Sequence, residues 1–279
     1  MSFVIFLGAS YETQRPFKSR HVMTIFPLPA FNDNYIWIIQ DKDSSDIWAV
    51  DPGKADVVLN YCHEYQKTLA GILITHHHKD HIGGVAELKQ HSNCPVYGPK
   101  HLTDLVTHAV DENDQVQVFS KIFTVIATPG HTLDHLCYFS DQQNPILFCG
   151  DTLFKGGCGR IMEGTPEQML TAMNKISSLP DDTLIYGTHE YTLANYRFAL
   201  SVEPDNEELM VSNQVSQQLR QENKPTLPTK LSLEKKTNPF LRSHIETVKT
   251  QSAQQLNEKP APNSVAAFSQ VRRAKDSFS

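Results

Sequence analysis

The sequence predicts an α/β protein in which two sheets are covered by helices, followed by a smaller, mainly helical unit. Short apolar runs bounded by turn residues alternate with helical patterns from residue 23 to about residue 190, and elements mixed in this way stack in layers. After residue 191 the composition shifts toward Glu, Gln, Lys and Asn, and strand-like runs become rare. With 279 residues the chain is long enough to bury a substantial core.

The layered part begins with three short apolar strands at 24–27, 35–40 and 47–50. They predict a meander that ends at the Asp-Pro-Gly turn at 51–53. A helix at 55–67 follows, and the apolar run after it is typical of a buried strand. The remaining elements of this part are strands at 70–75, 96–97, 116–119, 123–128, 136–140, 146–149 and 183–186, and helices at 82–91 and 166–178, the last with a proline at its start.

Helical patterns at 206–222 and 261–275 dominate the last part of the chain, with loops at 224–228 and 237–239. The stretch that precedes the first strand lacks the basic region and cleavage site of a secretory signal. It fits a disordered segment, a poor targeting peptide or a mis-assigned start. We therefore divide the chain into an N-terminal extension at 1–22, a layered domain at 23–190 and a helical domain at 191–279.

Composition narrows the class of protein. A net charge of -6 disfavours a nucleic-acid or anionic-membrane binder, because both depend on clustered Lys and Arg. Five cysteines without a CxxC pair indicate reduced thiols in a reducing compartment. No apolar run approaches the roughly 20 residues of a membrane span. We expect a cytoplasmic monomer that binds neither nucleic acid nor membrane, with a mitochondrial location as the alternative.

The strongest chemical signal is a histidine cluster at 75–81, Thr-His-His-His-Lys-Asp-His, between an apolar strand and a Gly-containing helix. His76 and His78 alternate at a strand end and can point to the same side, whereas Asp80 and His81 begin the helix and can face a second point nearby. This loop can therefore serve two metal ions.

Three further ligand-type residues share one local pattern. His131, Asp151 and His189 each follow a predicted strand through a glycine-containing turn, and α/β layers place function at the carboxyl ends of strands. Five His and two Asp would give two sites of nearly equal coordination. We assign His76, His78 and His131 to a first metal, Asp80, His81 and His189 to a second, and Asp151 as the bridge.

From residue 23 onward the sequence resembles the metallo-β-lactamase superfamily and, within it, the glyoxalase II (hydroxyacylglutathione hydrolase) family. In that family the seven metal ligands fall on the positions assigned above. The resemblance implies a four-layer αββα sandwich of the metallo-β-lactamase type with a smaller, mainly helical C-terminal domain. The superfamily motifs lie at 31–35, 50–53, 75–81, 128–132 and 150–154, and the glutathione thioesterase motifs at 157–160, 187–192, 238–242 and 272–276.

The resemblance implies hydrolysis of S-D-lactoylglutathione and related S-2-hydroxyacylglutathiones to D-lactate and glutathione, the second step of methylglyoxal detoxification. Water between two divalent cations loses much of its pKa, from ~15.7 towards ~7, so hydroxide is available as the nucleophile. Asp80 is expected to orient this hydroxide as well as to ligate. Zinc is our first choice of metal, although imidazole and carboxylate ligands also suit iron and manganese.

Glutathione recognition requires further groups, because this substrate carries two carboxylates and one ammonium. The resemblance implies that Arg160, Tyr191, Arg272 and Lys275 contact glutathione. Arg272 and Lys275 are three residues apart and can share one helix face. Met162 occupies a position at which family members often carry an aromatic residue.

Several nearby residues have two interpretations or a structural one. His135 is either a hydrogen-bonding partner of a ligand or an ordinary strand residue, and Asp51 either orients a ligand histidine or shapes a turn. Cys158 has no paired base, so we interpret it as structural and not as a nucleophile. His77 is expected to fill loop space, and His101 to lie on the surface.

The rival functions within this fold are β-lactam hydrolysis, persulfide oxygenation by a single-iron dioxygenase, and nucleic-acid cleavage. The C-terminal basic motif argues against the lactamases, and the length of residues 196–279 argues against the dioxygenases. The net charge of -6 argues against the nucleases. A non-catalytic metal-binding protein is disfavoured because none of the seven ligands is missing.

Overall fold

The computed structural model of this chain describes residues 23–278. The extension predicted at 1–22 lies outside these residues. Among the described strands, six form a first sheet, six a second sheet and two a small ribbon. The first sheet, in spatial order, contains β1 (Met23–Ala30), β2 (Asn34–Asp41), β3 (Asp46–Val50), β4 (Thr68–Leu73), β5 (Val96–Pro99) and β6 (His108–Val110).

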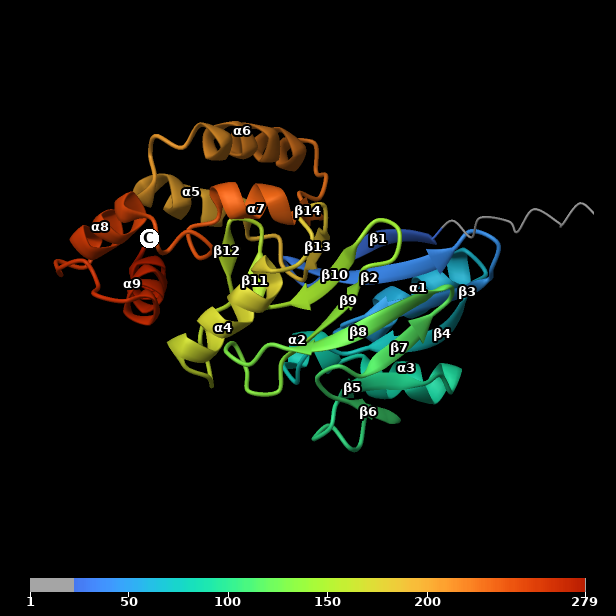
Figure 1. Cartoon of the computed structure of the whole chain (residues 1–279). Coiled ribbons are helices and arrows are strands. Elements are labelled where there is room, and N and C mark those ends of the chain that lie inside the picture. Colours follow the sequence, from blue (N-terminus) through green and yellow to red (C-terminus); the bar gives the residue numbers. More distant parts are fainter. Residues whose placement is uncertain (1–22, 279) are drawn as a thin grey trace, which may run out of the picture.

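The second sheet is built mostly from the middle of the chain (Figure 1). Its edge strand comes from the C-terminal part and pairs antiparallel with its neighbour, a contribution that the helical prediction for that part did not include. In spatial order the strands are β14 (Thr229–Lys230), β13 (Leu184–Gly187), β10 (Ile146–Gly150), β9 (Leu136–Ser140), β8 (Lys121–Ala127) and β7 (Gln115–Val118), and the ribbon pairs β11 (Leu153–Phe154) with β12 (Gly157–Cys158).

The predicted meander is confirmed, because β1, β2 and β3 pair antiparallel in sequence order. Strands β3 to β6 then run parallel, and the connections carry the helices that a parallel sheet needs on its face. The helices of the layered part are α1 (Ala55–Glu64), α2 (Lys79–Ile82), α3 (Val85–Ser92) and α4 (Pro166–Ser177).

Alternation along β2 separates the two faces of the first sheet. Tyr35, Trp37 and Ile39 join the core between the sheets. Ile36 and Ile38 pack with residues of α1 and α3 on the outer side. The strand is thus buried on both faces, as in the interior of a layered protein.

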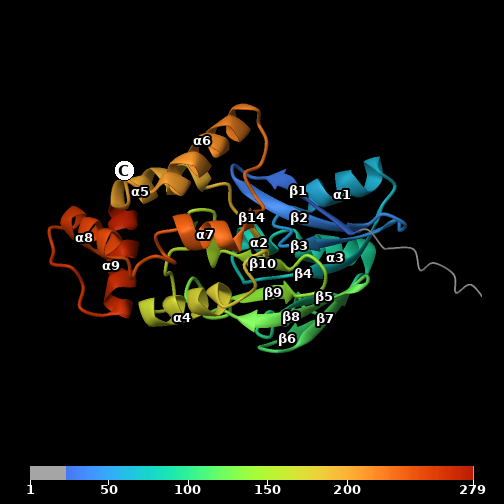
Figure 2. The ribbon, with the colours of Figure 1, turned by 45° about the horizontal axis from the view of Figure 1, so that its top comes forward.

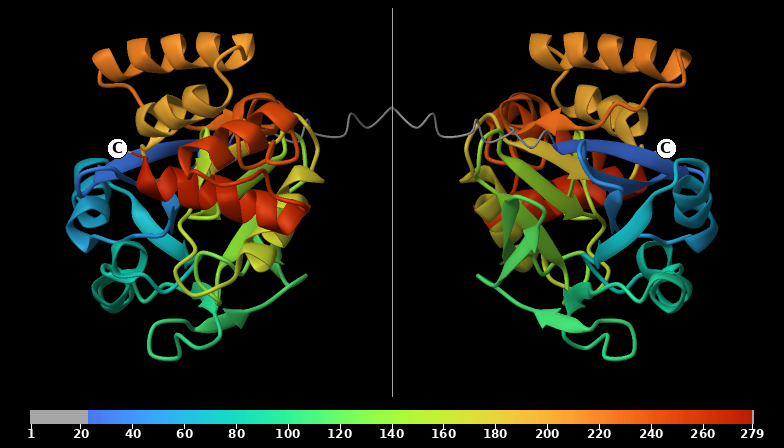
Figure 3. Two further views of the ribbon diagram at one scale, coloured as in Figure 1. Left: turned by 90° about the vertical axis from the view of Figure 1, so that its left-hand side faces the viewer. Right: turned by 90° about the vertical axis from the view of Figure 1, so that its right-hand side faces the viewer.

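The second sheet alternates in the same way along β10. Ile146 and Phe148 face the core between the sheets, whereas Leu147 and Cys149 pack with α4 and the C-terminal helices. The two sheets lie face to face in both side views (Figure 3). The predicted four-layer αββα sandwich with a smaller, mainly helical C-terminal unit is therefore confirmed.

The C-terminal helices gather at one end of the sandwich (Figures 1 and 2). There α9 packs on α4 and α8, and α5 packs on α6 and α8. Phe198, Phe240 and Phe268 are buried in the same core as residues of the second sheet. The bounds are α5 (Thr192–Val202), α6 (Glu207–Gln221), α7 (Leu231–Thr237), α8 (Glu246–Gln255) and α9 (Ser264–Ser277).

The helix predicted at 82–91 was wrong in its first turn, where α2 ends and α3 begins. Gly83 and Gly84 lie between them, against the turn that follows β3. A Cβ on Gly84 would lie 2.4 Å from the backbone nitrogen of Ala55 and 2.6 Å from the carbonyl oxygen of Pro52. The break therefore lets the loop of the first sheet approach the histidine cluster closely.

Among the described helices, none combines the length and the apolar character that crossing a membrane requires.

Candidate metal centre and its cavity

The seven predicted ligands meet at one edge of the sandwich, although they come from four separate places in the sequence. One loop follows β4 and leads into α2, and three others follow β8, β10 and β13. Because these strands end at the same edge, residues more than a hundred positions apart become neighbours. The seven residues are His76, His78, Asp80, His81, His131, Asp151 and His189.

The first predicted group is compact. The Nε2 of His76 lies 3.1 Å from the Nδ1 of His78, and the Nε2 of His131 lies 3.1 Å from the same atom. Ligand atoms of these three residues all lie within 4.8 Å of one another. Three imidazoles arranged in this way can bind one transition-metal ion.

The second predicted group has one carboxylate and two imidazoles. Asp80 Oδ2 lies 3.5 Å from the Nε2 of His81 and 3.5 Å from the Nε2 of His189. Their ligand atoms also lie within 4.8 Å of one another. A carboxylate with two imidazoles is again a donor set typical of zinc, iron or manganese.

Asp151 lies between the two groups. Its Oδ1 is 3.4 Å from His81 Nε2, and its Oδ2 is 3.4 Å from His131 Nε2 and 3.3 Å from His189 Nε2. The carboxylate thus contacts histidines assigned to both metals. This is the position that a bridging ligand requires.

Buried atoms in this cluster lack the partners that burial normally demands. His81 Nε2 and Asp151 Oδ1 are both buried and have no hydrogen-bond partner among the described residues. An unpaired buried polar atom is costly, whereas a bound cation would satisfy both atoms at once. The residues present therefore fit a pair of divalent cations.

The electrostatics of the cluster favour the ligand forms of His76 and Asp151. Burial, reinforced by His81 and His135, holds the pKa of His76 well below its usual value, so its imidazole stays neutral. Burial raises the pKa of Asp151, but the neighbouring His81 and His189 outweigh burial and hold that pKa well below its usual range. A neutral imidazole and an ionised carboxylate are the forms that bind metal.

The proposed ligands His81 and His131 are each oriented by a hydrogen bond on the far side of the ring. His81 Nδ1 lies 3.0 Å from Asp51 Oδ2, which also accepts the hydroxyl proton of Thr75 at 2.7 Å. His131 Nδ1 lies 2.7 Å from the carbonyl oxygen of Arg160. Such partners fix the tautomer and the ring orientation of a metal ligand. Asp51 therefore holds the ring of His81, which is consistent with the first of its two predicted roles.

Two orienting residues come from the hairpin turn between β1 and β2, and the sequence did not indicate their role. Asp33 Oδ1 lies 2.8 Å from His189 Nδ1, and the amide of Asn34 donates to Asp80 Oδ2 at 2.9 Å. Both residues belong to the motif at 31–35. That motif was the only available signal, since their partners lie far along the chain.

His135 is fully buried and supports a ligand. Its Nε2 accepts the backbone N–H of Asp151 at 3.1 Å, and its Nδ1 lies 2.9 Å from the hydroxyl of Thr128. Both ring nitrogens are thus engaged within the protein. His135 therefore takes the first of its two predicted roles, as a hydrogen-bonding partner that holds a ligand loop.

Cys158 is buried beside the cluster. Burial raises the pKa of its thiol to about 11, although the neighbouring Arg272 opposes the shift. A thiol with this pKa is protonated at neutral pH and is a poor nucleophile. The side chain therefore fits the structural role predicted for it.

One cavity of about 560 Å³ runs from the histidine cluster to the C-terminal helix α9. The ring of Tyr191 stacks on that of His189 with centroids 4.7 Å apart. Ligand cavities of this size accommodate molecules as large as a modified tripeptide. All four residues predicted to contact glutathione line the cavity: Arg160, Tyr191, Arg272 and Lys275.

The three basic residues that line the cavity differ in how firmly their side chains are held. Arg272 is buried and donates to the carbonyl oxygen of Cys158 at 3.0 Å and to Asp276 at 2.8 Å. The side chain of Arg160 is 75% exposed. Lys275 donates to the carbonyl oxygen of Ala194 at 3.2 Å. The ammonium of Lys275 and the guanidinium of Arg160 are therefore the more adaptable cationic groups.

Two family models match the chain. The metallo-beta-lactamase superfamily model matches residues 66–189, and the model described as the C-terminus of hydroxyacylglutathione hydrolase matches residues 190–278. The two matches adjoin between His189 and Glu190.

Curated relatives match along their whole length. A hydroxyacylglutathione hydrolase of Marinomonas sp. (strain MWYL1) is 82% identical over 257 residues, which are 92% of this chain and 100% of the relative. A hydroxyacylglutathione hydrolase of Vibrio cholerae is 46% identical over 259 residues, again 92% of this chain and 100% of the relative.

Solved structures share the fold. The structure of ETHE1 from Myxococcus xanthus has a TM-score of 0.61 at 23% identity and covers 91% of this chain and 98% of its own. The BLEG-1 B3 metallo-beta-lactamase has a TM-score of 0.52 at 25% identity, with 60% of this chain and 91% of its own covered. These two similarities show that the chain shares its layered fold with both structures.

Proposed function

The chain belongs to the hydroxyacylglutathione hydrolase family, glyoxalase II, of the metallo-β-lactamase superfamily, and we propose that its seven clustered His and Asp residues hold two divalent cations for this reaction. Its activity is hydroxyacylglutathione hydrolysis, the glyoxalase II step of methylglyoxal detoxification. The proposal extends this activity to particular residues and a particular substrate, S-D-lactoylglutathione.

One observation carries the proposal: a single cavity joins the ligand cluster to the basic residues of α9. A thioester of glutathione needs both ends of this cavity, because its carbonyl must reach the metal centre while its carboxylates require cationic partners. Neither end alone would distinguish this substrate from others.

The metal centre is proposed to contain His76, His78 and His131 around one cation, Asp80, His81 and His189 around the other, and Asp151 between them. Two cations bound there would supply hydroxide at neutral pH and polarise the thioester carbonyl. Zinc is the proposed occupant, and iron and manganese suit the same nitrogen and oxygen donors.

Asp80 is the residue proposed to orient the nucleophile. Its Oδ2 already accepts the amide N–H of Asn34 at 2.9 Å, so the side chain is held toward the histidines. Asp80 is about half-buried, and its pKa is lowered: burial alone would raise it, but His81 and the hydrogen bond from Asn34 prevail. The carboxylate therefore stays ionised and can accept a hydrogen bond from the attacking hydroxide.

The proposed reaction needs no dedicated general acid. Hydroxide adds to the thioester carbonyl, the carbon–sulfur bond breaks, and glutathione leaves as a thiolate that takes its proton from solvent. A thiol pKa near ~8.5 makes this thiolate an adequate leaving group at neutral pH. The fully protonated Cys158 takes no part in these steps.

The glutathione moiety is proposed to lie along Tyr191, Arg160 and Lys275. Lys275 and Arg160 offer positive charge to its carboxylates, and the Tyr191 phenol offers a hydrogen bond. Arg272 is proposed to support this wall of the cavity, because its guanidinium donates a hydrogen bond to the carbonyl oxygen of Cys158.

We retain the division at residues 190 and 191, which gives a metal-binding domain and a glutathione-binding domain. We also propose that the protein is a cytoplasmic monomer without nucleic-acid or membrane partners.

A substrate panel tests the proposed function. Purified protein of known metal content is offered S-D-lactoylglutathione, a β-lactam and glutathione persulfide under identical conditions. The proposal expects rapid, chelator-sensitive hydrolysis of the thioester, without oxygen uptake on the persulfide or opening of the β-lactam. Preferred turnover of the persulfide or the β-lactam would support the sister activities of the fold instead.

A further inference from the structure

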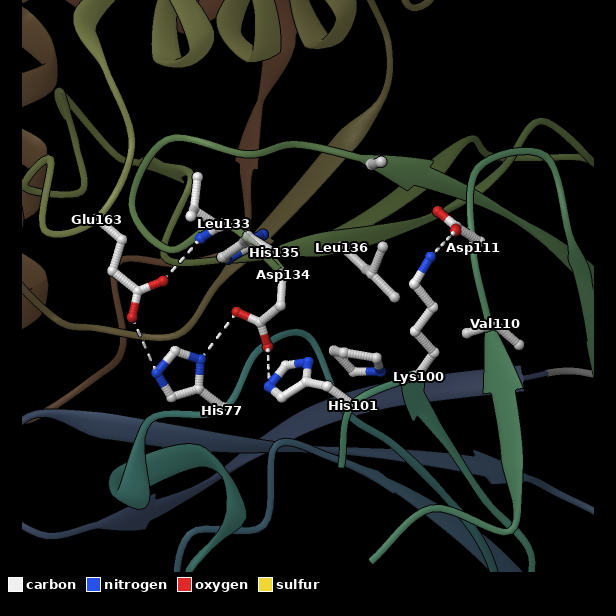
Figure 4. Close-up of a pocket in the computed structure, with 12 residues that line it drawn as sticks. His77, Lys100, His101, Val110, Asp111, Leu133, Asp134, His135, Leu136 and Glu163 are labelled. Atoms are coloured by element: carbon white, nitrogen blue, oxygen red, sulfur yellow. Dashed lines mark hydrogen bonds and ion pairs between the residues drawn. The ribbon is translucent and has the colours of Figure 1, made fainter. Parts of the chain in front are cut away.

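A second cluster of metal-capable side chains adjoins the loop between β4 and α2 and does not include the seven residues described above (Figure 4). His77 belongs to the loop between β4 and α2, and His101 follows β5. Asp134 lies between β8 and β9. Ligand atoms of these three residues all lie within 4.8 Å of one another. The sequence had suggested a space-filling role for His77 and a surface position for His101.

Asp134 is the centre of this cluster. Its Oδ1 lies 2.9 Å from His77 Nδ1, and its Oδ2 lies 3.4 Å from His101 Nε2. Asp134 Oδ2 is buried yet has no hydrogen-bond partner within residues 23–278. Its lone pairs have therefore lost water without gaining a proton donor, which is a costly arrangement unless a cation binds there.

Glu163 holds the nearer histidine from the other side. Its Oε1 lies 3.2 Å from His77 Nε2, and its Oε2 accepts the backbone N–H of Leu133 at 2.9 Å. With the Nε2 proton directed at Glu163, the Nδ1 lone pair of His77 points toward Asp134. Carboxylate, histidine and metal are commonly arranged in this order in metalloproteins.

The surroundings admit a cation and leave it open to solvent. The three residues line a cavity of about 480 Å³ together with Pro99 and Lys100. Lys100 is paired with Asp111 at 3.3 Å, as Figure 4 shows. The two carboxylates of Asp134 and Glu163 therefore dominate the charge next to the histidines.

We propose that His77, His101 and Asp134 form a third metal site, which binds a divalent transition-metal cation of the zinc class. Two imidazole nitrogens and one carboxylate oxygen suit such an ion, whereas calcium and magnesium prefer oxygen donors throughout. Solvent completes the coordination, because His77 is 32% and His101 51% exposed.

The site would connect the three loops that carry His77, His101 and Asp134. Two of them carry proposed catalytic ligands, since His77 lies between His76 and His78, and Asp134 follows His131 by three residues. A cation that binds the folded state alone stabilises it by mass action. Occupancy should therefore raise the unfolding temperature of the enzyme.

Counting bound zinc tests this proposal. Full-length enzyme is dialysed against increasing free Zn²⁺, and bound zinc per chain is measured for the wild type and for His101→Ala. Exposed His91 on α3 supplies the matched control, His91→Ala. We expect His101→Ala to bind one equivalent less than wild type and His91→Ala to bind the same number as wild type. This difference does not depend on how many metals the catalytic centre holds.

Two further measurements sharpen the result. Glu163→Gln should weaken the extra equivalent by about 10- to 100-fold without abolishing it, because Glu163 orients His77 and does not bind the metal. Zinc added beyond the catalytic requirement should raise the unfolding temperature of wild type and His91→Ala but not of His101→Ala. Equal zinc counts in wild type and His101→Ala would overturn the proposal and leave His77 as a side chain held between two carboxylates. Loss of the equivalent in His91→Ala would also overturn it, by showing adventitious binding to surface histidines.

Discussion

Asp33 and His189 are 156 residues apart in the sequence, yet their side chains meet at 2.8 Å between Asp33 Oδ1 and His189 Nδ1. The contact links the first hairpin turn of one sheet to a proposed metal ligand that follows β13 of the other sheet. Beside it, Asn34 and His189 form an isolated backbone bridge, and the backbone N–H of Tyr35 donates to the carbonyl oxygen of Thr188 at 2.7 Å. The hairpin thus fixes both the ring and the backbone of this ligand.

Replacing Asp33 with asparagine should therefore weaken metal binding. The amide cannot hold the Nδ1 proton of His189 as a carboxylate does, and losing such a partner typically costs about 10- to 100-fold in metal affinity or activity. Competition with a coloured chelator measures the affinity of each equivalent. We expect one of two catalytic equivalents to bind more weakly. Asp43→Asn, in the exposed turn after β2, is the control, and equal losses in both variants would refute the role of Asp33.

Removing the charge of Lys275 should affect substrate binding. The expected result for Lys275→Ala is an increase in KM of about tenfold to a hundredfold, the value of a charge-assisted hydrogen bond, with metal content and kcat largely retained. Initial rates and metal analysis check this result. Lys259→Ala, at an exposed loop position before α9, should leave KM unchanged. An unchanged KM in Lys275→Ala would remove this lysine from the glutathione site.

The same lysine predicts how substrate affinity depends on pH. Burial, followed by the positive charges of Arg272 and Arg197, lowers the pKa of Lys275 to about 8. Because the lowered pKa means loss of the charge as pH rises through about 8, KM should rise on the alkaline side and stay flat below it. Lys275→Arg keeps its charge throughout and should lose this alkaline rise. KM is measured between about pH 6.5 and 9.5, with rates corrected for spontaneous thioester hydrolysis. If the alkaline rise in KM persists in Lys275→Arg, the rise belongs to another titrating group.

The helical unit and the second sheet share one core, so they should unfold together. Phe268 is fully buried on α9 among residues of α4 and the second sheet. Phe268→Ala should lower the free energy of unfolding by about 3–5 kcal/mol while keeping a single transition. Exposed Val215→Ala on α6 should change it by less than about 0.5 kcal/mol. Urea unfolding followed by fluorescence and circular dichroism tests this, and two separate transitions would contradict the shared core.

Local patterns in the sequence were sufficient for most strands of the two sheets, though not for β6 and β14, and for the ligand cluster. The run from Tyr35 to Ile39 is apolar on both faces, and each of His131, Asp151 and His189 follows a strand and a glycine turn. Such signals lie within a few residues and survive without knowledge of the fold. The family resemblance then supplied the identity of the substrate and the glutathione contacts.

Features that depend on distant contacts were not predictable. The buried face of helix α5 includes the polar residues Thr192 and Asn195, whereas Leu193 and Leu200 are only partly buried, so no apolar stripe marks this helix in the sequence. The partnership of Asp33 with His189, and the cluster around Asp134, join loops that only the stacked sheets bring together. Composition and periodicity contain no information about such pairs.

The central claim is that two cations held by these seven residues hydrolyse a glutathione thioester. The most direct test is to remove metal from the purified enzyme, return zinc stepwise, and record S-D-lactoylglutathione hydrolysis at each measured occupancy. Asp151→Ala, which deletes the shared ligand, is titrated in parallel. The account predicts that activity rises until two catalytic equivalents are bound and stays near zero in the variant. Full activity in metal-free enzyme, or none with both equivalents bound, would contradict it.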